Sequence, residues 1–159
     1  DWSSDVCSSD LNALRRAIGM GEHDVAPRIS DLAAMRAALE GKVEFETIED
    51  GREDQIIDRL IQGAVVAVFN RRASITDLEP ITNNFKAGLA ADVGEALPLD
   101  HYTRLLGEVE GLRDAVQQVA PDATTPAAQA AAVEFILEGL HLNKRLNKDA
   151  VSGQARYRG

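Results

Sequence analysis

The sequence EDQIIDRLIQGAVVAVF, which runs from Glu53 to Phe69, gives the clearest indication of the fold. Its apolar residues recur at the spacing of one helical face, whereas most of its charged and amide side chains occupy the opposite face. We therefore predict a core-facing helix whose inward residues are Ile56, Ile57, Leu60, Ile61, Ala64, Val65, Val68 and Phe69. An aspartate at position 57 or 60 would bury an unpaired carboxylate and is expected to prevent folding.

Two shorter helices and one strand are predicted before this helix. Residues 12–18 read as the end of a helix that is stopped by the pair Gly19 and Gly21. The pair Ser30-Asp31 can cap a second helix, which carries Leu32, Met35 and Leu39 on one stripe and ends at Gly41. Apolar and acidic residues alternate directly afterwards, so a short edge strand is predicted near residues 43–48.

Four further helices are predicted after Phe69. The first begins at Thr76 or Asp77 and carries the apolar residues Leu78, Ile81 and Phe85. The other three cover residues 100–106, 112–119 and 127–146. The inward residues of the last helix are expected to be Val133, Ile136, Leu137 and Leu140. Thr125 and Pro126 are a strong start signal for the longest of them. Residues 89–98, rich in glycine and alanine, are predicted to be a linker, and residues 147–159 a basic, mobile tail. These patterns predict an all-α fold of about seven helices.

The first eleven residues, Asp1 to Leu11, read as the translation of a sequencing adapter rather than as natural protein sequence. The adapter bases TGC TCT TCC GAT CT encode Cys-Ser-Ser-Asp and then, because every CTN codon specifies leucine, Leu11. The alternative is a disordered natural terminus rich in serine and aspartate. We expect the segment to make no packed contact with the rest of the chain. The residues after it would then be a piece of a larger protein.

Without this segment the chain has a moderate negative charge and no cysteine. The segment contains Cys7, Trp2 and three of the 26 acidic residues, so that 23 acidic residues remain against 17 basic ones, a formal charge of −6. Neither a disulfide nor a thiolate zinc site can then form, which fits a reducing, cytoplasmic environment. No apolar run approaches the ~20 residues that span a bilayer. The acidic balance predicts neither nucleic acid nor membrane as a partner, because both surfaces are anionic.

The sequence lacks the motifs of nucleotide binding and of nucleophilic catalysis. It contains neither the phosphate-binding G-x-x-x-x-G-K-[ST] nor G-x-G-x-x-G, and it has no G-x-S-x-G. The three histidines, His23, His101 and His141, lie far apart and lack the spacing of metal ligands. We therefore predict no catalytic, cofactor-binding or metal-binding residue in this chain.

One face of the helix predicted at 127–146 carries Glu134, Glu138 and His141, and the last two are spaced as Glu-x-x-His. That spacing builds di-iron sites in four-helix bundles only together with a second copy and two further glutamates. No second copy is present, and Arg145 continues the same stripe. We therefore interpret this face as solvated, with charge pairs between successive turns.

Two further runs of charge indicate contacts with other molecules. Residues 40–58 hold eight acids against Lys42 and Arg52, which fits either a charged surface loop or an acidic docking strip for a basic partner. The C-terminal run of cations comprises Lys144, Arg145, Lys148, Arg156 and Arg158. Because only Tyr157 is interleaved among them, they fit an acidic neighbouring subunit better than nucleic acid.

Several stretches resemble the C-terminal region of magnesium-chelatase-type AAA+ ATPases, a family of bacterial proteins described as magnesium chelatases or as sigma-54-interacting regulators. The stretches are Asn12-Ala-Leu-Arg-Arg-Ala-Ile, Gly41-Lys-Val-Glu, the run EFILEGLHLNKRLNK from Glu134 to Lys148, and Ala155-Arg-Tyr-Arg. The resemblance covers essentially all of residues 12–159 and lies in whole-segment pattern rather than in a catalytic motif. It implies a helical segment of the lid type at 12–88 and C-terminal helices at 99–146.

The resemblance also implies a parent protein whose ATPase core precedes Asn12. That core would carry the phosphate-binding loop, the Mg²⁺-binding acid and the sensor arginines, so ATP and Mg²⁺ would be cofactors of the parent and would not bind this chain alone. In a homo-oligomeric ring, ATP hydrolysis would drive Mg²⁺ insertion into a porphyrin or the remodelling of a partner through a von Willebrand A-type subunit. Arg15 and Arg16 would be surface or interface arginines of the lid helix.

This chain would then serve subunit contact and the relay of the nucleotide state. The alternative is a non-enzymatic helical interaction module of a transcriptional regulator. The genomic DNA upstream distinguishes the two hypotheses. A sequence that encodes a phosphate-binding strand–loop–helix would favour the ATPase, and a start codon near Asn12 would favour the module.

Overall fold

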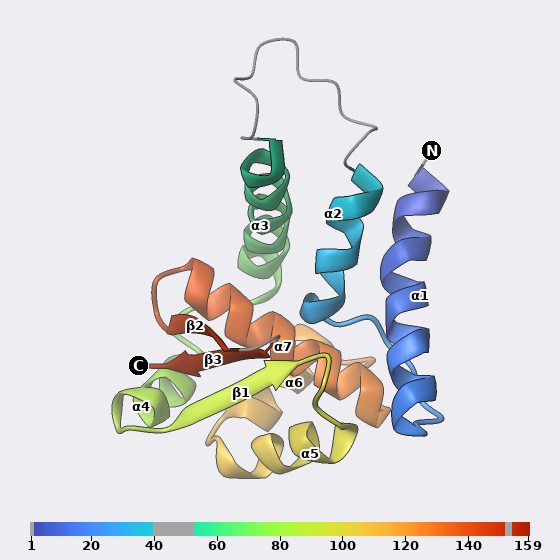
Figure 1. Ribbon diagram of the computed structural model, residues 1–159. Helices are drawn as coiled ribbons and strands as arrows, with labels where there is room; N and C mark the ends of the chain where they lie inside the picture. The colour runs from blue at the N-terminus through green and yellow to red at the C-terminus, as the bar shows by residue number, and fades with distance from the viewer. Residues whose placement is uncertain (1, 40–52, 152–153) are drawn as a thin grey trace.

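The computed structural model describes residues 2–39, 53–151 and 154–159, which form seven α-helices, one 3₁₀ helix and three strands (Figure 1). The elements are α1 (Trp2–Met20), η1 (Ile29–Leu32), α2 (Ala33–Leu39), α3 (Glu53–Arg72), α4 (Glu79–Lys86), β1 (Ala90–Gly94), α5 (Leu99–Glu108), α6 (Leu112–Val119), α7 (Pro126–Leu142), β2 (Asn147–Val151) and β3 (Gln154–Arg158). The strands form one antiparallel sheet in the order β1-β3-β2. Within the described ranges, no helix is both long and apolar enough to cross a bilayer.

The predicted predominance of helix is confirmed, but the prediction of an all-α fold is wrong. Strand β1 lies in the predicted linker, 89–98, and β2 and β3 lie in the predicted mobile tail, 147–159. The strand predicted at 43–48 falls outside the described residues. Five-residue strands show too little alternation to be recognised locally. In addition, the partners of β1 in β3 are 60 or more residues away along the chain.

The sheet has one apolar face and one charged face. Tyr157, 1% exposed, contributes to the apolar face, which packs towards α7 together with Ala91 and Val93. On the opposite face Arg156 donates two hydrogen bonds to Asp92, at 2.7 and 2.9 Å. Buried apolar and exposed charged side chains therefore alternate along the strands, as expected for an antiparallel sheet with one buried face.

Helix α7 is the centre of the core, and α3, α5 and α6 all pack against it. Its inward residues are those predicted, namely Val133, Ile136, Leu137 and Leu140, each 0% exposed. The backbone of Gly139 lies directly against the Phe69 ring of α3: a Cβ atom at position 139 would be 2.1 Å from the ring Cδ2. Glycine is therefore what permits this close approach of the two helices.

Only part of the predicted inward face of α3 is buried. Ile57 and Phe69 are 1% and 0% exposed, whereas Leu60 is 60% exposed and Val68 38%. The helix projects beyond the body of the molecule and packs mainly on α7, with α2 on one side (Figure 1). The expectation for an aspartate at Leu60 is therefore wrong, because its carboxylate would stay in water.

Helix α1 begins at Trp2 and continues without interruption to Met20. The predicted end of a helix at 12–18 is confirmed. The expectation that residues 1–11 make no packed contact is wrong at Ser9, which is 7% exposed. Ser9 lies on the same buried face of α1 as Asn12 and Arg16. Because the helix is continuous, this face places Ser9 against the rest of the molecule.

Candidate functional site

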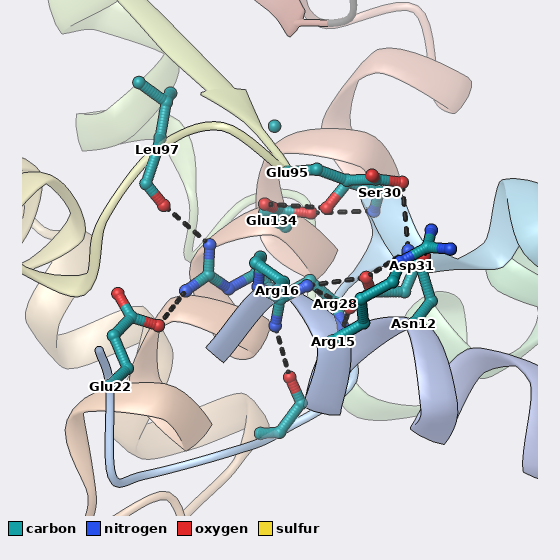
Figure 2. A network of polar contacts seen from close by, with 12 residues as sticks. Asn12, Arg15, Arg16, Glu22, Arg28, Ser30, Asp31, Glu95, Leu97 and Glu134 are labelled. Carbon is teal, nitrogen blue, oxygen red and sulfur yellow. Dashed lines mark hydrogen bonds and ion pairs between the residues drawn. The ribbon is translucent and has the colours of Figure 1, made fainter. Parts of the chain in front are cut away.

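A network of buried charged and polar side chains joins α1, η1, α5 and α7. We call it the arginine–carboxylate network; its members are Asn12, Arg16, Arg28, Ser30, Asp31, Tyr102 and Glu134. Figure 2 shows the part of it around Arg16, Arg28 and Asp31. Asp31 is 0% exposed, Glu134 1% and Arg28 2%. Burying ionised groups is costly unless each is paired or hydrogen-bonded, so the arrangement of these side chains is tightly constrained.

Asp31 is the centre of the network. The guanidinium of Arg16 donates to both of its carboxylate oxygens, at 2.6 Å to Oδ1. The Asn12 amide donates to Asp31 at 2.8 Å and to Glu95 at 3.0 Å, and the backbone N–H of Arg28 donates to Asp31 Oδ2 at 2.8 Å. These bonds fix α1 on η1. The expectation that Arg16 lies at the surface is therefore wrong, since it is 8% exposed.

Arg28 connects η1 to α5. Its Nη1 donates to the carbonyl oxygen of Leu97 at 3.0 Å, and its Nη2 lies 3.9 Å from the Glu22 carboxylate. Its Cζ lies 4.5 Å from the centroid of the Tyr102 ring, which is within the range of a cation–π contact. Its Nε and Nη2 have no hydrogen-bond partner among the described residues.

Glu134 connects α7 to η1 and α5. Its carboxylate accepts from the backbone N–H of Ser30 at 2.8 Å, from the Ser30 hydroxyl at 3.3 Å, and from the Tyr102 hydroxyl. The backbone N–H of Gly94 in turn donates to the Tyr102 oxygen at 3.1 Å. Burial, and then the charge of Glu134, raises the pKa of Tyr102 well above its ordinary value.

One turn further along α7, Glu138 forms a second buried pair with the sheet. It accepts from the Tyr157 hydroxyl and, at 2.7 Å, from Lys148 Nζ. Burial and the Glu138 charge raise the pKa of Tyr157. His141, the next member of the predicted stripe, instead contacts the carbonyl oxygen of Leu146 at 3.0 Å.

The interpretation of this helix face as solvated is therefore wrong, since Glu134 and Glu138 are 1% and 6% exposed. No group of three metal-ligating side chains converges within the described part of the chain. Two sequence signals could have revealed the buried pairs. The glutamates interrupt an otherwise apolar helix, and Tyr102 and Tyr157 are the only two tyrosines available to bind them.

The other predicted charge clusters are only partly brought together. Of the cationic run, Lys148, Arg156 and Arg158 pair with Glu138, Asp92 and Asp149, respectively. Lys144 and Arg145 are exposed and form no ion pair with described residues. Arg15 is exposed and donates to Asn12 Oδ1 at 2.6 Å. Of the acidic run, residues 40–52 lie outside the described ranges, and Asp58 is half-buried on α3.

Both buried tyrosines predict a loss of stability at high pH. A tyrosine in the unfolded chain ionises near pH 10.0, whereas Tyr102 and Tyr157 hold their protons at higher pH when folded. Above pH 10 the unfolded chain binds fewer protons, so the free energy of unfolding should fall by about 1.4 kcal/mol per pH unit for each tyrosine. Urea denaturation between pH 8 and pH 11 measures this slope. The Tyr157→Phe variant should show a shallower slope, and an unchanged slope would contradict the assignment.

The network and the pair of Glu138 and Tyr157 hold several helices and the sheet together through their carboxylates and the two tyrosines. Each carboxylate accepts hydrogen bonds from two or more groups, and each tyrosine hydroxyl is held in its protonated form. Buried hydrogen-bonded groups of this kind hold elements in one relative position. No family model matches the sequence, and searches of curated proteins and of solved structures find no match either.

Proposed function

We propose that this chain is the C-terminal helical part of a magnesium-chelatase-type AAA+ ATPase subunit, in which it serves subunit contact and relays the nucleotide state. The observation that supports the relay is the continuity of the arginine–carboxylate network. It runs from Arg16 on α1 through Asp31 and Ser30 to Glu134 on α7, and then to Tyr102 on α5. In the parent protein α1 would follow the ATPase core, so a conformational change of the core on ATP hydrolysis would reach α1 first.

A network of buried, hydrogen-bonded charges suits such a relay. Its members cannot shift singly without leaving a charge unpaired, which costs several kcal/mol. A displacement of α1 would therefore move η1 and α7 together. Energetic coupling between distant sites travels through packed and hydrogen-bonded elements of this kind when they have two discrete arrangements.

ATP and Mg²⁺ would bind the upstream core of the parent. Within the described ranges, no three histidine, cysteine, aspartate or glutamate side chains converge on a metal position. The sequence also has no glycine-rich lysine loop to hold phosphates. For the parent we further propose three kinds of partner: neighbouring subunits of the ring, a von Willebrand A-type subunit, and a porphyrin or protein substrate.

A direct test is calorimetry of residues 12–159 with Mg-ATP. Because phosphate binding needs a loop of backbone N–H groups and a lysine, no saturable heat is expected. The parent protein with its upstream core should bind Mg-ATP and should hydrolyse it faster as protein concentration rises, since ring motors complete their sites between subunits. Saturable micromolar binding by residues 12–159 alone would overturn the proposal.

The relay itself predicts a difference between two equivalent tyrosine substitutions in the parent. Tyr102→Phe removes the hydroxyl that binds Glu134, within the path from α1. Tyr157→Phe removes the hydroxyl that binds Glu138, outside that path. We expect Tyr102→Phe to lower the ATPase rate of the assembled ring several-fold while the affinity for ATP is unchanged, and Tyr157→Phe to have little effect. Equal losses in the two variants would show that the network is only structural.

The alternative, a helical interaction module of a transcriptional regulator, is favoured by one observation. Leu14 and Ile18 on α1 are 45% and 72% exposed and form an apolar stripe without a described partner. Sequencing the genomic DNA upstream separates the two. A phosphate-binding motif in the same reading frame supports the ATPase, and a start codon near Asn12 supports the module.

A further inference from the structure

The two edges of the sheet differ in whether their backbone groups are bonded. At the β1 edge, the carbonyl oxygen of Asp92 lies 2.7 Å from His101 Nε2. The N–H of Gly94 donates to the Tyr102 hydroxyl at 3.1 Å. Both side chains come from α5, which therefore closes this edge against further strands.

The β2 edge is open. The backbone groups of Asp92 and Gly94 point towards α5 and therefore away from β3. Because hydrogen-bonded positions alternate along antiparallel strands, the backbone N–H and C=O groups of Lys148 and Ala150 in β2 also point away from β3. No described residue bonds to these outward N–H and C=O groups. The preceding carbonyl, that of Leu146, is already bonded to His141 Nδ1 at 3.0 Å. The open part of the edge thus begins at Lys148, and Ala150 on it is exposed.

Two unpaired cations stand at one end of this open edge. Lys144 and Arg145 directly precede β2, are exposed, and form no ion pair with the described part of the chain. The cations within the strands, by contrast, all have acidic partners. The charge at this end of the edge therefore favours an acidic segment in a partner.

A hollow of about 220 Å³ adjoins the inner side of β2 at Lys148. It lies between α3 and the η1–α2 segment. Its lining is mixed: Ile29, Leu32, Ala33, Ile61 and Val65 are apolar, and Asp58, Gln62, Glu138 and Lys148 are polar. A strand placed beside β2 would direct alternate side chains to this inner side, where the hollow can accept one small side chain.

We infer that the β2 edge binds an extended segment of a partner protein as a fourth strand, antiparallel to β2. The segment carries apolar residues at alternate positions and acidic residues at its C-terminal end, which meets Lys144 and Arg145. Main-chain hydrogen bonds to Lys148 and Ala150 hold it, as in other cases of strand addition. This inference does not depend on the ATPase proposal, because it concerns only the sheet.

The test uses the capped synthetic peptide TVTVTVEE, titrated into the chain and followed by amide NMR. Saturable binding is expected, with protection from hydrogen exchange gained at the Lys148 and Ala150 amides. Before peptide is added, these two amides should exchange faster than that of Asp149, which faces β3. A matched peptide with N-methyl groups on the residues whose amides face β2 should bind at least tenfold more weakly.

Two protein variants refine the result. Ala150→Pro removes an outward N–H and should weaken binding at least tenfold, whereas Ala150→Ser should bind like the parent sequence. Charge reversal of Lys144 and Arg145 should weaken binding several-fold and reduce its salt dependence. Equal affinity of the N-methylated peptide, or no saturable binding of TVTVTVEE, overturns the inference even if Ala150→Pro does not fold. Neither outcome bears on ATP binding by the parent.

Discussion

Replacing Asp31 with alanine is expected to remove a large part of the stability of the fold. The substitution leaves the guanidinium of Arg16 buried without its carboxylate, and it also removes an acceptor from Asn12 and from the Arg28 backbone. Breaking a buried ion pair on one side costs about 3–5 kcal/mol. Single domains are stable by only about 5–15 kcal/mol in total. Urea denaturation followed by far-UV circular dichroism measures the loss.

Asp149 provides the matched control. It pairs with Arg158 at 2.8 Å, as Asp31 pairs with Arg16, but its side chain is 43% exposed rather than 0%. Exposed ion pairs contribute at most about 1 kcal/mol, so Asp149→Ala should be nearly neutral. Similar losses in the two variants would show that the burial of Asp31 has been misjudged.

Gly139→Ala is expected to be strongly destabilising. The new Cβ would lie 2.1 Å from Cδ2 of Phe69, whose side chain is 0% exposed and has no room to move aside. Overpacking of a core typically costs about 1–3 kcal/mol and more where the backbone cannot shift. We expect a loss at or above the top of that range, measured as a lower denaturation midpoint.

The double variant Gly139→Ala with Phe69→Leu tests the cause. Leucine frees the space that the new methyl group needs, so the double variant should be more stable than the sum of the two single changes predicts. Gly63→Ala on α3 is the control, because nothing lies within 4 Å of its Cβ position. Alanine there should raise stability by about 0.5–1 kcal/mol through its higher helix propensity. Additive losses at 139 and 69 would refute steric conflict as the cause.

The helices were predictable because their information is local. The period of apolar residues in α7 identified four side chains, those of Val133, Ile136, Leu137 and Leu140, that are in fact fully buried. In α3 the same reasoning assigned too wide a face, since its neighbours α7 and α2 leave apolar residues such as Leu60 in water. Periodicity reports which side a helix buries, but it does not report how far the neighbour extends.

The sheet and the buried network depended on contacts between distant residues. Nothing in the sequence pairs Asp31 with Arg16 or Glu134 with Tyr102, because the partners belong to other helices. A long-range pair of this kind leaves no periodic trace in a single sequence. The two tyrosines and the two glutamates on an apolar helix were the only local indications.

The order of the strands also bears on how the protein can be synthesised. The middle strand, β3, is the last of the three to leave the ribosome, and β1 has no bonding partner in the sheet until it does. The nascent polypeptide must therefore carry β1 unpaired through the synthesis of α5, α6, α7 and β2. A premature stop just before Gln154 would leave β1 and β2 without the strand that both of them pair with. Closure of the sheet therefore waits for β3.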